Sequence, residues 1–441
     1  MLRSRTSITS NTFPVTLMML AGAMLTTGTL PAQENQWIVP DNNWANLSEA
    51  GSSTGLRAYV IAKRGSDAVV NAAKAQALGR HLGLADAQAS ATLPLWFYNA
   101  VSPRDNKGYF GIVVGNDPFN VGGTARVPTY IIPVIITTNT VGVSSNSNTG
   151  VITTAAGVTT FDPTAADNVC MAAPNNVPAT VLRQSPIFEN TSFIFGGTDV
   201  GNTQYLDAFQ RASFWKVLKD QNEYHVLLDP VNELAPVAIN VPAAYGTTLP
   251  TSSTSGVCGR VGIIDVNWLD NYLSTVVLPA LAAQGVNTGS FPIFTLHNTV
   301  ESLRVTNLNY CCTLGYHGVN GPPVQTYAVV DFDTSRAFSP AAQDTGSLSH
   351  EIGDWMNDPV GSNYIPAWGH TGQVSGCDSS LEAGDPLTGN LAPSIVMPNG
   401  FTYHLQEMAF YSWFLGGPSI ALSGWYSNNA SFVKDAGPPC H

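Results

Sequence analysis

Residues 344–358 read DTGSLSHEIGDWMND, and this stretch decides the fold that the sequence predicts. Asp344 or Thr345 can cap a helix here, because short polar side chains accept hydrogen bonds from the first free backbone amides. The helix is expected to run to about Asn357. Asp358 is followed by proline, which disfavours a further helical turn and ends the helix.

Three side chains of this helix are spaced for metal chemistry. His350 and Asp354 are four residues apart and share one face, with Glu351 next to His350. This is the layout of the H-E-x-x-H helix of metallohydrolases, with Asp354 in place of the second histidine. The imidazole and the carboxylate can hold a divalent metal, and Glu351 can take a proton from water on the metal. The spacing alone equally allows a buried helix histidine beside two solvated acids.

The segments around this helix resemble a known family. The string SHEIGDWMNDP is followed by Trp368, by LEAGDPL at 381–387 and by a Tyr-x-x-Gln element at 403–406. This order is similar to that of secreted zincin-like metallopeptidases with an S-H-E-x-x-E-x-x-x-D-P helix, and of exordium-like (phosphate-induced) proteins. The resemblance covers about residues 190–415 and is specific only over 349–386.

The resemblance implies a function. It implies a zincin-like domain, zinc as the cofactor, Glu351 as the general base and a peptide or protein as the substrate. Two positions depart from the family pattern: Asp354 replaces a glutamate, and Pro386-Leu387 stands where Leu-Cys is usual. The first departure bears on metal affinity, and the second implies a different partner for Cys377.

The third metal ligand has three candidates. Glu382 is the first choice, because it lies in the segment that matches the family's acidic element. Asp385 belongs to the same segment, although an aspartate before proline is often a turn residue. His370 lies 20 residues beyond His350 next to a glycine, and imidazole is a better zinc ligand than carboxylate. An acid-rich set also suits calcium, so the alternative is a non-catalytic extracellular or cell-surface protein with a structural calcium site or no metal.

Composition narrows the class of protein. The 441 residues carry a net charge of −12, and only 11% are charged. This excludes a nucleic-acid-binding surface, which needs a basic face. Hydrophobic residues make up 44%, enough for a large core, while the 40 glycines and 29 prolines indicate many turns. Helical and strand patterns alternate in the second half, so we expect an α+β or α/β protein with a β-rich region at 33–170 and a zincin-like domain at 185–441.

The N-terminus and the cysteines both indicate export. Residues 1–32 have the basic, apolar and small-residue order of a signal peptide, so we expect a secreted or periplasmic protein. The later sequence has no apolar run of bilayer length, so the mature chain is not expected to be embedded in a membrane. The six cysteines form no C-x-x-C pair, which favours up to three disulfides. The adjacent Cys311 and Cys312 are expected to bond to two different partners.

Periodicity predicts the other elements. Helices are expected at 67–84, 204–218 and 266–283, the last one kinked or shortened by Pro279. The region 139–160 is expected to form hairpins or loops. Strands are expected at 95–98, 109–114, 129–138, 192–195, 224–228, 237–241, 291–296 and 327–331.

Overall fold

The computed structural model describes residues 37–38, 56, 58–82, 92–120, 123–218, 223–250, 256–435 and 440. The predicted signal peptide, residues 1–32, lies outside the described residues. The described residues belong to one compact unit. The protein is a mixed α+β structure rich in strands, as predicted. No helix in the described ranges is both long enough and apolar enough to cross a membrane.

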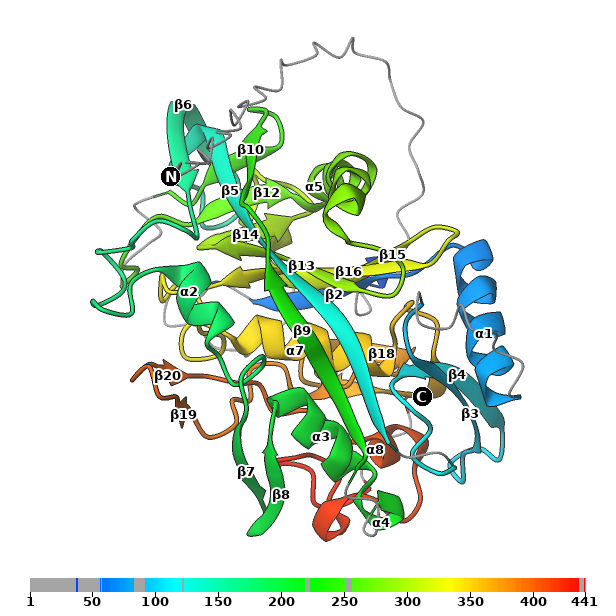
Figure 1. Ribbon diagram of the computed structural model, residues 1–441. Helices are drawn as coiled ribbons and strands as arrows, with labels where there is room; N and C mark the ends of the chain where they lie inside the picture. The colour runs from blue at the N-terminus through cyan, green and yellow to red at the C-terminus, as the bar shows by residue number, and fades with distance from the viewer. Residues whose placement is uncertain are drawn as a thin grey trace, which may run out of the picture. The chain divides into compact units, whose positions relative to one another are not determined.

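A mixed sheet of twelve strands forms the centre of the molecule (Figure 1). The long strand β5 (Thr124–Ser145) pairs in parallel with β13 (Phe291–His297), and β13 pairs in parallel with β16 (Gln325–Phe332). Strand β15 (Cys311–Asn320) is antiparallel to β16. The remaining strands of this sheet are β1 (Trp37–Ile38), β2 (Tyr59–Lys63), β6 (Ile152–Phe161), β9 (His225–Glu233), β10 (Val237–Val241), β11 (Gly246–Thr248), β12 (Gly262–Asp265) and β14 (Thr299–Ser302).

Four two-stranded hairpins accompany the sheet. They are β3 (Leu95–Val101) with β4 (Gly108–Val114), β7 (Thr191–Phe195) with β8 (Thr198–Thr203), β17 (Tyr364–Thr371) with β18 (Val374–Ser380), and β19 (Ile395–Val396) with β20 (Thr402–Tyr403). All eight predicted strands are present. The region 139–160, which was expected to form hairpins or loops, is a hairpin of β5 and β6.

The helices lie on both sides of the sheet (Figure 1). The predicted helix at 67–84 is α1 (Asp67–His81), and the one at 204–218 divides into α3 (Tyr205–Ser213) and α4 (Trp215–Leu218). In the segment 266–283, α5 (Val266–Tyr272) widens into a π-turn at Leu273–Val277 before α6 (Leu278–Leu281). The irregularity comes just before Pro279, whose missing N–H cannot bond to the preceding turn. The other helices are α2 (Pro178–Arg183), α7 (Gly346–Asn357) and α8 (Tyr411–Leu415).

Helix α7 is the predicted metal-binding helix, and it ends as expected at Asp358. The prediction that Asp344 or Thr345 caps this helix is confirmed for the position and wrong for the side-chain hydrogen bond. Thr345 is the N-cap residue, but its side chain makes no capping hydrogen bond. Asp344 accepts instead from the amides of Thr345 and His404, so it ties the helix start to a distant segment.

The two predicted regions share the central sheet. Strand β5 belongs to the predicted N-terminal region, and its partner β13 belongs to the predicted C-terminal domain. All seven residues of β13 are buried, as expected for a strand covered on both faces. The two regions therefore pack as one structure around this strand pair.

All six cysteines form disulfides: Cys170 with Cys258, Cys311 with Cys312, and Cys377 with Cys440. The expectation of three disulfides is confirmed and is compatible with an exported protein. The expectation of different partners for Cys311 and Cys312 is wrong. The other four cysteines pair among themselves, and the adjacent pair lies buried at the start of β15.

Candidate metal centre

Helix α7 is held in a buried position, where all twelve of its residues are shielded from solvent. Its apolar side chains Leu348, Ile352 and Trp355 join the main core, and Trp355 stacks on Phe291 with ring centroids 3.7 Å apart. Helix α7 packs on β15 and β16. The polar side chains of the helix therefore have to find their partners inside the protein.

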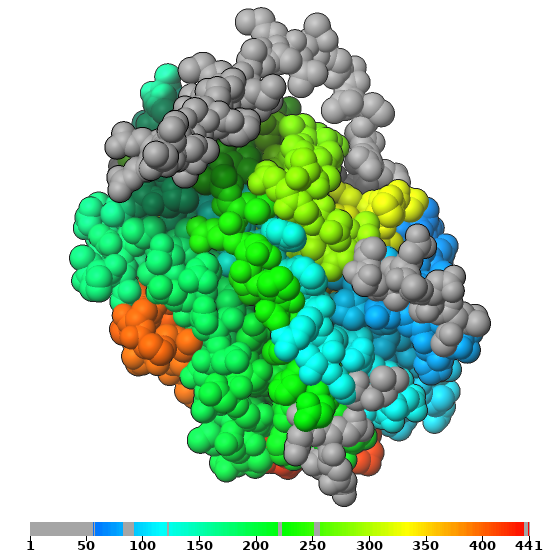
Figure 2. Space-filling view, viewed as in Figure 1, coloured from blue at the N-terminus to red at the C-terminus, as the bar shows by residue number. Residues whose placement is uncertain are grey.

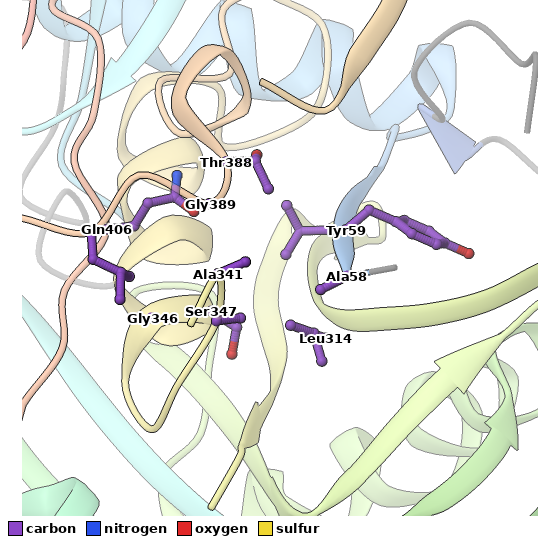
Figure 3. A pocket seen from close by; sticks show the side chains of 12 residues that line it. Ala58, Tyr59, Leu314, Ala341, Gly346, Ser347, Thr388, Gly389 and Gln406 are labelled. Carbon is purple, nitrogen blue, oxygen red and sulfur yellow. The ribbon is translucent and has the colours of Figure 1, made fainter. Parts of the chain in front are cut away.

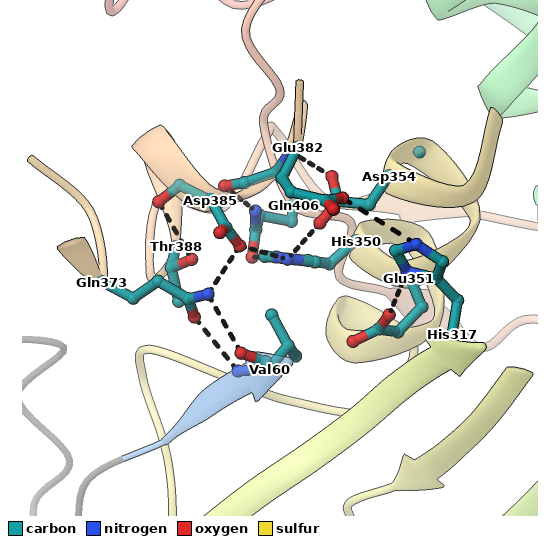
Figure 4. A network of polar contacts seen from close by, with 12 residues as sticks. Val60, His317, His350, Glu351, Asp354, Gln373, Glu382, Asp385, Thr388 and Gln406 are labelled. Carbon is teal, nitrogen blue, oxygen red and sulfur yellow. Dashed lines mark hydrogen bonds and ion pairs between the residues drawn. The ribbon is translucent and has the colours of Figure 1, made fainter. Parts of the chain in front are cut away.

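The predicted ligands His350 and Asp354 face each other, as their spacing implies (Figure 4). His350 Nε2 lies 2.8 Å from Asp354 Oδ2 and 3.1 Å from Asp385 Oδ1. The three side chains form a group whose potential ligand atoms all lie within 4.8 Å of one another. The sequence alternative Asp385 thus takes the third position.

A close approach of backbone to imidazole brings Asp385 into this group. A Cβ atom on Gly384 would lie 2.7 Å from the ring of His350, so only glycine allows the segment to come this near. The amide of Gly384 donates to Asp354 Oδ1 at 2.5 Å. The segment that carries Asp385 is thereby attached directly to α7.

Gln406 determines which nitrogen of His350 carries hydrogen. Its Nε2 donates to the carbonyl of Gly384 at 2.8 Å, so its Oε1 faces His350 Nδ1 at 2.9 Å. Because Oε1 is only an acceptor, Nδ1 must be the protonated nitrogen. His350 Nε2 then either carries a second proton or offers its lone pair to a cation. This is the usual way in which a metal-binding histidine is oriented.

Asp385 has a comparable support from Gln373. The Nε2 group of Gln373 donates to Asp385 Oδ1 at 2.5 Å and to the carbonyl of Val60 at 3.0 Å. Its Oε1 accepts from the amide of Val60 at 3.0 Å. The third ligand candidate is therefore linked through Gln373 to strand β2, whose Val60 lies 313 positions earlier in the chain.

Buried carboxyl groups outnumber buried imidazoles around this group. Burial raises the pKa of Asp385 to about 8 and raises the pKa of Glu382 well above its ordinary value, and neighbouring carboxylates add to both shifts. Burial alone lowers the pKa of His350, but Asp354 and Asp385 outweigh it and raise that pKa well above normal. The network contains five carboxyl groups and only two imidazoles: Glu351, Asp354, Asp358, Glu382, Asp385, His317 and His350. Protons or a cation must balance the excess.

The three donors fit a divalent ion. Nitrogen and oxygen donors around a tetrahedral zinc ion lie about 3.3 Å apart, so His350 would separate from each carboxylate by a few tenths of an ångström. One imidazole and two carboxylates suit zinc and also harder ions such as calcium. Glu382 Oε1 and Oε2 both lack hydrogen-bond partners among the described residues. These acidic surroundings favour a cation over a neutral occupant.

Glu351, the predicted base, contacts a residue that the sequence did not single out. Its Oε2 lies 3.2 Å from His317 Nδ1 on β15, and its Oε1 has no hydrogen-bond partner within the described structure. His317 Nε2 in turn lies 3.2 Å from the carbonyl oxygen of Asp358. Both nitrogens of His317 thus face acceptors, so a proton is shared between His317 and Glu351. Burial, the largest influence, raises the pKa of Glu351.

The other two predicted ligands, Glu382 and His370, are not part of the three-residue group. Glu382, the first choice, is buried but not part of the three-residue group; its Oε2 lies 3.9 Å from His317 Nε2. His370 is exposed on β17, beside the disulfide of Cys377 and Cys440, whose sulfurs cannot act as thiolates. Within the segment 381–387, Asp385 and not Glu382 lies beside His350 and Asp354.

Sequence reasoning missed His317 altogether and named Gln406 only as part of the 403–406 element. His317 is the only histidine, acid, lysine or arginine in the buried strand CCTLGYHGV. A histidine in such a strand needs a buried polar partner, and this requirement could have identified His317 as a candidate site residue.

No family model, curated protein or solved structure matches this chain. The zincin-like resemblance of α7 and of the segments after it therefore stays a prediction based on the residues quoted above.

Proposed function

We propose that the protein is a secreted metal-dependent hydrolase that cleaves peptide bonds. The observation that carries the proposal is the convergence of His350 Nε2, Asp354 Oδ2 and Asp385 Oδ1 in a buried, electronegative site, with the histidine tautomer set by Gln406. Zinc is the proposed ion, with calcium as the alternative. Such an ion would supply Lewis-acid polarisation of the substrate carbonyl group.

Glu351 is the proposed general base. It follows His350 directly on α7, and its free Oε1 can accept a proton from the attacking water molecule. Burial raises its pKa, which makes the carboxylate a stronger base near neutral pH. His317 holds the other oxygen and is the proposed positioning residue for Glu351.

A structural cation site is the second candidate, and the enclosure of the site favours it. His350, Asp354 and Asp385 are only 0%, 3% and 5% exposed. The neighbouring cavity, which Gln406, Ser347 and Leu314 help to line, measures about 20 Å³ (Figure 3). That is room for about one water molecule, so a peptide enters only if this region opens.

Metal content and peptide cleavage, measured together, separate the two candidates. The mature protein should be purified with zinc or calcium present and desalted, and its metal content measured by elemental analysis beside cleavage of a fluorogenic peptide library. We expect about one equivalent of metal in wild type, and far less in His350→Ala and Asp385→Asn. Glu351→Gln should keep the metal and lose at least ~100-fold in cleavage.

Asp207→Asn is the matched control, since Asp207 is a fully buried aspartate on α3 that pairs with His225 and lies outside the three-residue group. It should change neither metal content nor cleavage. Wild type with less than about a tenth of an equivalent of any divalent metal would overturn both candidates. Stoichiometric metal without any cleavage would overturn the hydrolase and support the structural cation site.

A further inference from the structure

The β17–β18 hairpin carries a second group of potential metal ligands, and none of its members belongs to the three-residue group on α7. His370 on β17, Cys377 on β18 and Cys440 bring one ring nitrogen and two sulfurs within 4.8 Å of one another. The two sulfurs are joined in a disulfide, so they offer no thiolate in this form. Reduction of the disulfide would supply two thiolates beside an imidazole.

This disulfide is the most accessible of the three. Cys377 is exposed, whereas both cysteines of the adjacent pair are buried and both cysteines of the remaining pair are only half-buried. Disulfides are reduced by direct attack of a thiolate on a sulfur atom, so access to the sulfur controls the rate. We therefore expect Cys377–Cys440 to be reduced first.

The backbone presents the His370 imidazole next to the sulfurs. His370 has a φ of 59°, in the left-handed region that residues other than glycine rarely adopt. The pairing of β17 with β18 shifts register between Gly369 and Thr371, and an irregularity of this kind re-aims the side chains around it. The imidazole is exposed and has no hydrogen-bond partner among the described residues. Its lone pair is thus available to a metal ion.

The position of Cys440 depends on more than the disulfide. Its amide donates to the carbonyl of Ala367 at 3.4 Å. Its sulfur lies over Gly369, where a Cβ atom would be only 2.9 Å away, and Gly369 pairs directly with Cys377 across the hairpin. These contacts remain when the S–S bond is broken, so both sulfurs stay on the same part of the hairpin.

The three donors suit zinc. Two sulfurs on a tetrahedral zinc ion lie about 3.8 Å apart, since each Zn–S bond measures about 2.3 Å. The Cα atoms of Cys377 and Cys440 are 5.5 Å apart, so rotation of the two side chains is enough to reach this separation. Thiolate and imidazole donors select zinc over calcium and magnesium, and three protein ligands leave a fourth position for water.

We propose that reduction of the Cys377–Cys440 disulfide creates a zinc site made of Cys377, Cys440 and His370. A dithiol reductant supplies two electrons and two protons: its own sulfurs join in a disulfide, and the S–S bond of the protein opens to two thiols. Zinc then binds both sulfurs as thiolates, releases their two protons to solvent and accepts the lone pair of neutral His370. Bound zinc keeps the sulfurs from re-forming the disulfide. The proposal does not depend on the proposed hydrolase function.

Stepwise reduction followed by cobalt binding tests the proposal on the full mature chain. The protein is treated with increasing dithiothreitol without denaturant, alkylated and mapped by mass spectrometry. We expect the first two thiols to be Cys377 and Cys440, with the native circular dichroism retained. Reduction of another pair first, or loss of the native spectrum at this step, would overturn the proposal.

Cobalt(II) is the probe for the metal, because thiolate ligands give it a charge-transfer absorption that the sulfur-free group on α7 cannot produce. After removal of dithiothreitol under nitrogen, we expect this absorption at about one equivalent of cobalt in the reduced protein, none in the oxidised protein, and displacement by zinc. Absence of the absorption from the reduced protein would refute the site.

His370→Ala separates the three-ligand site from a pair of free thiols. It should keep both thiols and bind cobalt at least about tenfold more weakly, because even outer-shell partners change metal affinity 10–100-fold. His370→Cys, which supplies a third thiolate, should restore the affinity. The control is His81→Ala, at an exposed histidine that ends α1; blue atoms of the segment that contains α1 are visible at the surface in Figure 2. Equal cobalt affinity in His370→Ala and His81→Ala would overturn the role of His370.

Discussion

At the scale of single residues, Gln406 has the clearest influence on the proposed metal centre. Its side-chain Nε2 donates to the carbonyl of Gly384, and its backbone amide donates to Ser349 Oγ. The side chain therefore cannot rotate freely, and it presents an acceptor to His350 Nδ1. Partners of this kind typically change metal affinity 10–100-fold when they are removed.

The first prediction concerns this residue. Gln406→Leu removes the acceptor and leaves either nitrogen of His350 free to carry the hydrogen, so zinc affinity should fall by about 10–100-fold. Competition with a fluorescent zinc chelator measures the change. The control is Gln184→Leu, which removes a hydrogen bond from Asn399; neither residue belongs to the three-residue group. Equal losses in the two variants would show that Gln406 acts only on stability.

At the scale of elements, α7 packs tightly against the segment that contains Met408. Gly353 lies on the helix where Met408 crosses it, and a Cβ atom there would be 2.1 Å from the Met408 sulfur. Gly79 lies near the end of α1, and a Cβ atom there would meet nothing within 4 Å. The same substitution in two helices thus has opposite consequences.

The second prediction follows from this pair. Gly353→Ala should lower the free energy of unfolding by about 1–3 kcal/mol, because the added methyl group forces Met408 or the helix to move. Gly79→Ala should raise it by about 0.5–1 kcal/mol, because alanine has the better helix propensity. Urea denaturation of both variants and wild type gives the comparison. If Gly353→Ala were as stable as wild type, the close packing of α7 against 404–408 would be refuted.

At the scale of the whole molecule, buried acids make stability depend on pH. Burial raises the pKa of Asp333 and of Asp358 from 3.8 to about 6 each. Between these values the unfolded chain releases protons that the folded chain keeps, so stability falls as pH rises. Each shift of about two units corresponds to about 3 kcal/mol.

The third prediction is that the metal-free protein loses stability between about pH 4 and pH 6. The free energy of unfolding, obtained from urea denaturation at steps of half a pH unit in the presence of a chelator, should decline over this window. The contribution of these two groups should then become constant. Asp333→Asn should make the decline shallower, because one of the two groups is then absent. A free energy that rises steadily from pH 4 to pH 6 would contradict the burial of these carboxyl groups in their protonated form.

The fourth prediction concerns the disulfides. Cys170–Cys258 and Cys377–Cys440 join residues 88 and 63 positions apart, and closing loops of this length stabilises by about 4 kcal/mol each. Cys311–Cys312 closes no loop of that kind. Replacing both cysteines by serine should therefore cost clearly more stability at either long-range pair than at the adjacent pair. Peptide mapping without reduction should find these three pairings, and cross-links from Cys311 or Cys312 to other cysteines would refute them.

Sequence alone determined most local features of this protein. The strands and helices follow from alternating or helical placement of apolar residues, which acts over a few positions and is visible in the chain. His350 and Asp354 could be paired for the same reason, since a spacing of four residues places them on one helix face. The number of disulfides followed from an even number of cysteines without metal-binding spacing.

Only the tertiary structure decided the partners that come from distant segments. It placed Asp385, and not Glu382, within 4.8 Å of His350 and Asp354, because the direction of a side chain in a tight turn depends on how Gly384 packs against His350. It brought His317 to Glu351 across 34 positions and Gln406 to His350 across 56, and it left Cys311 and Cys312 to each other. Periodicity carries no information on contacts of this range, because they depend on how the sheet, α7 and the C-terminal segments pack together.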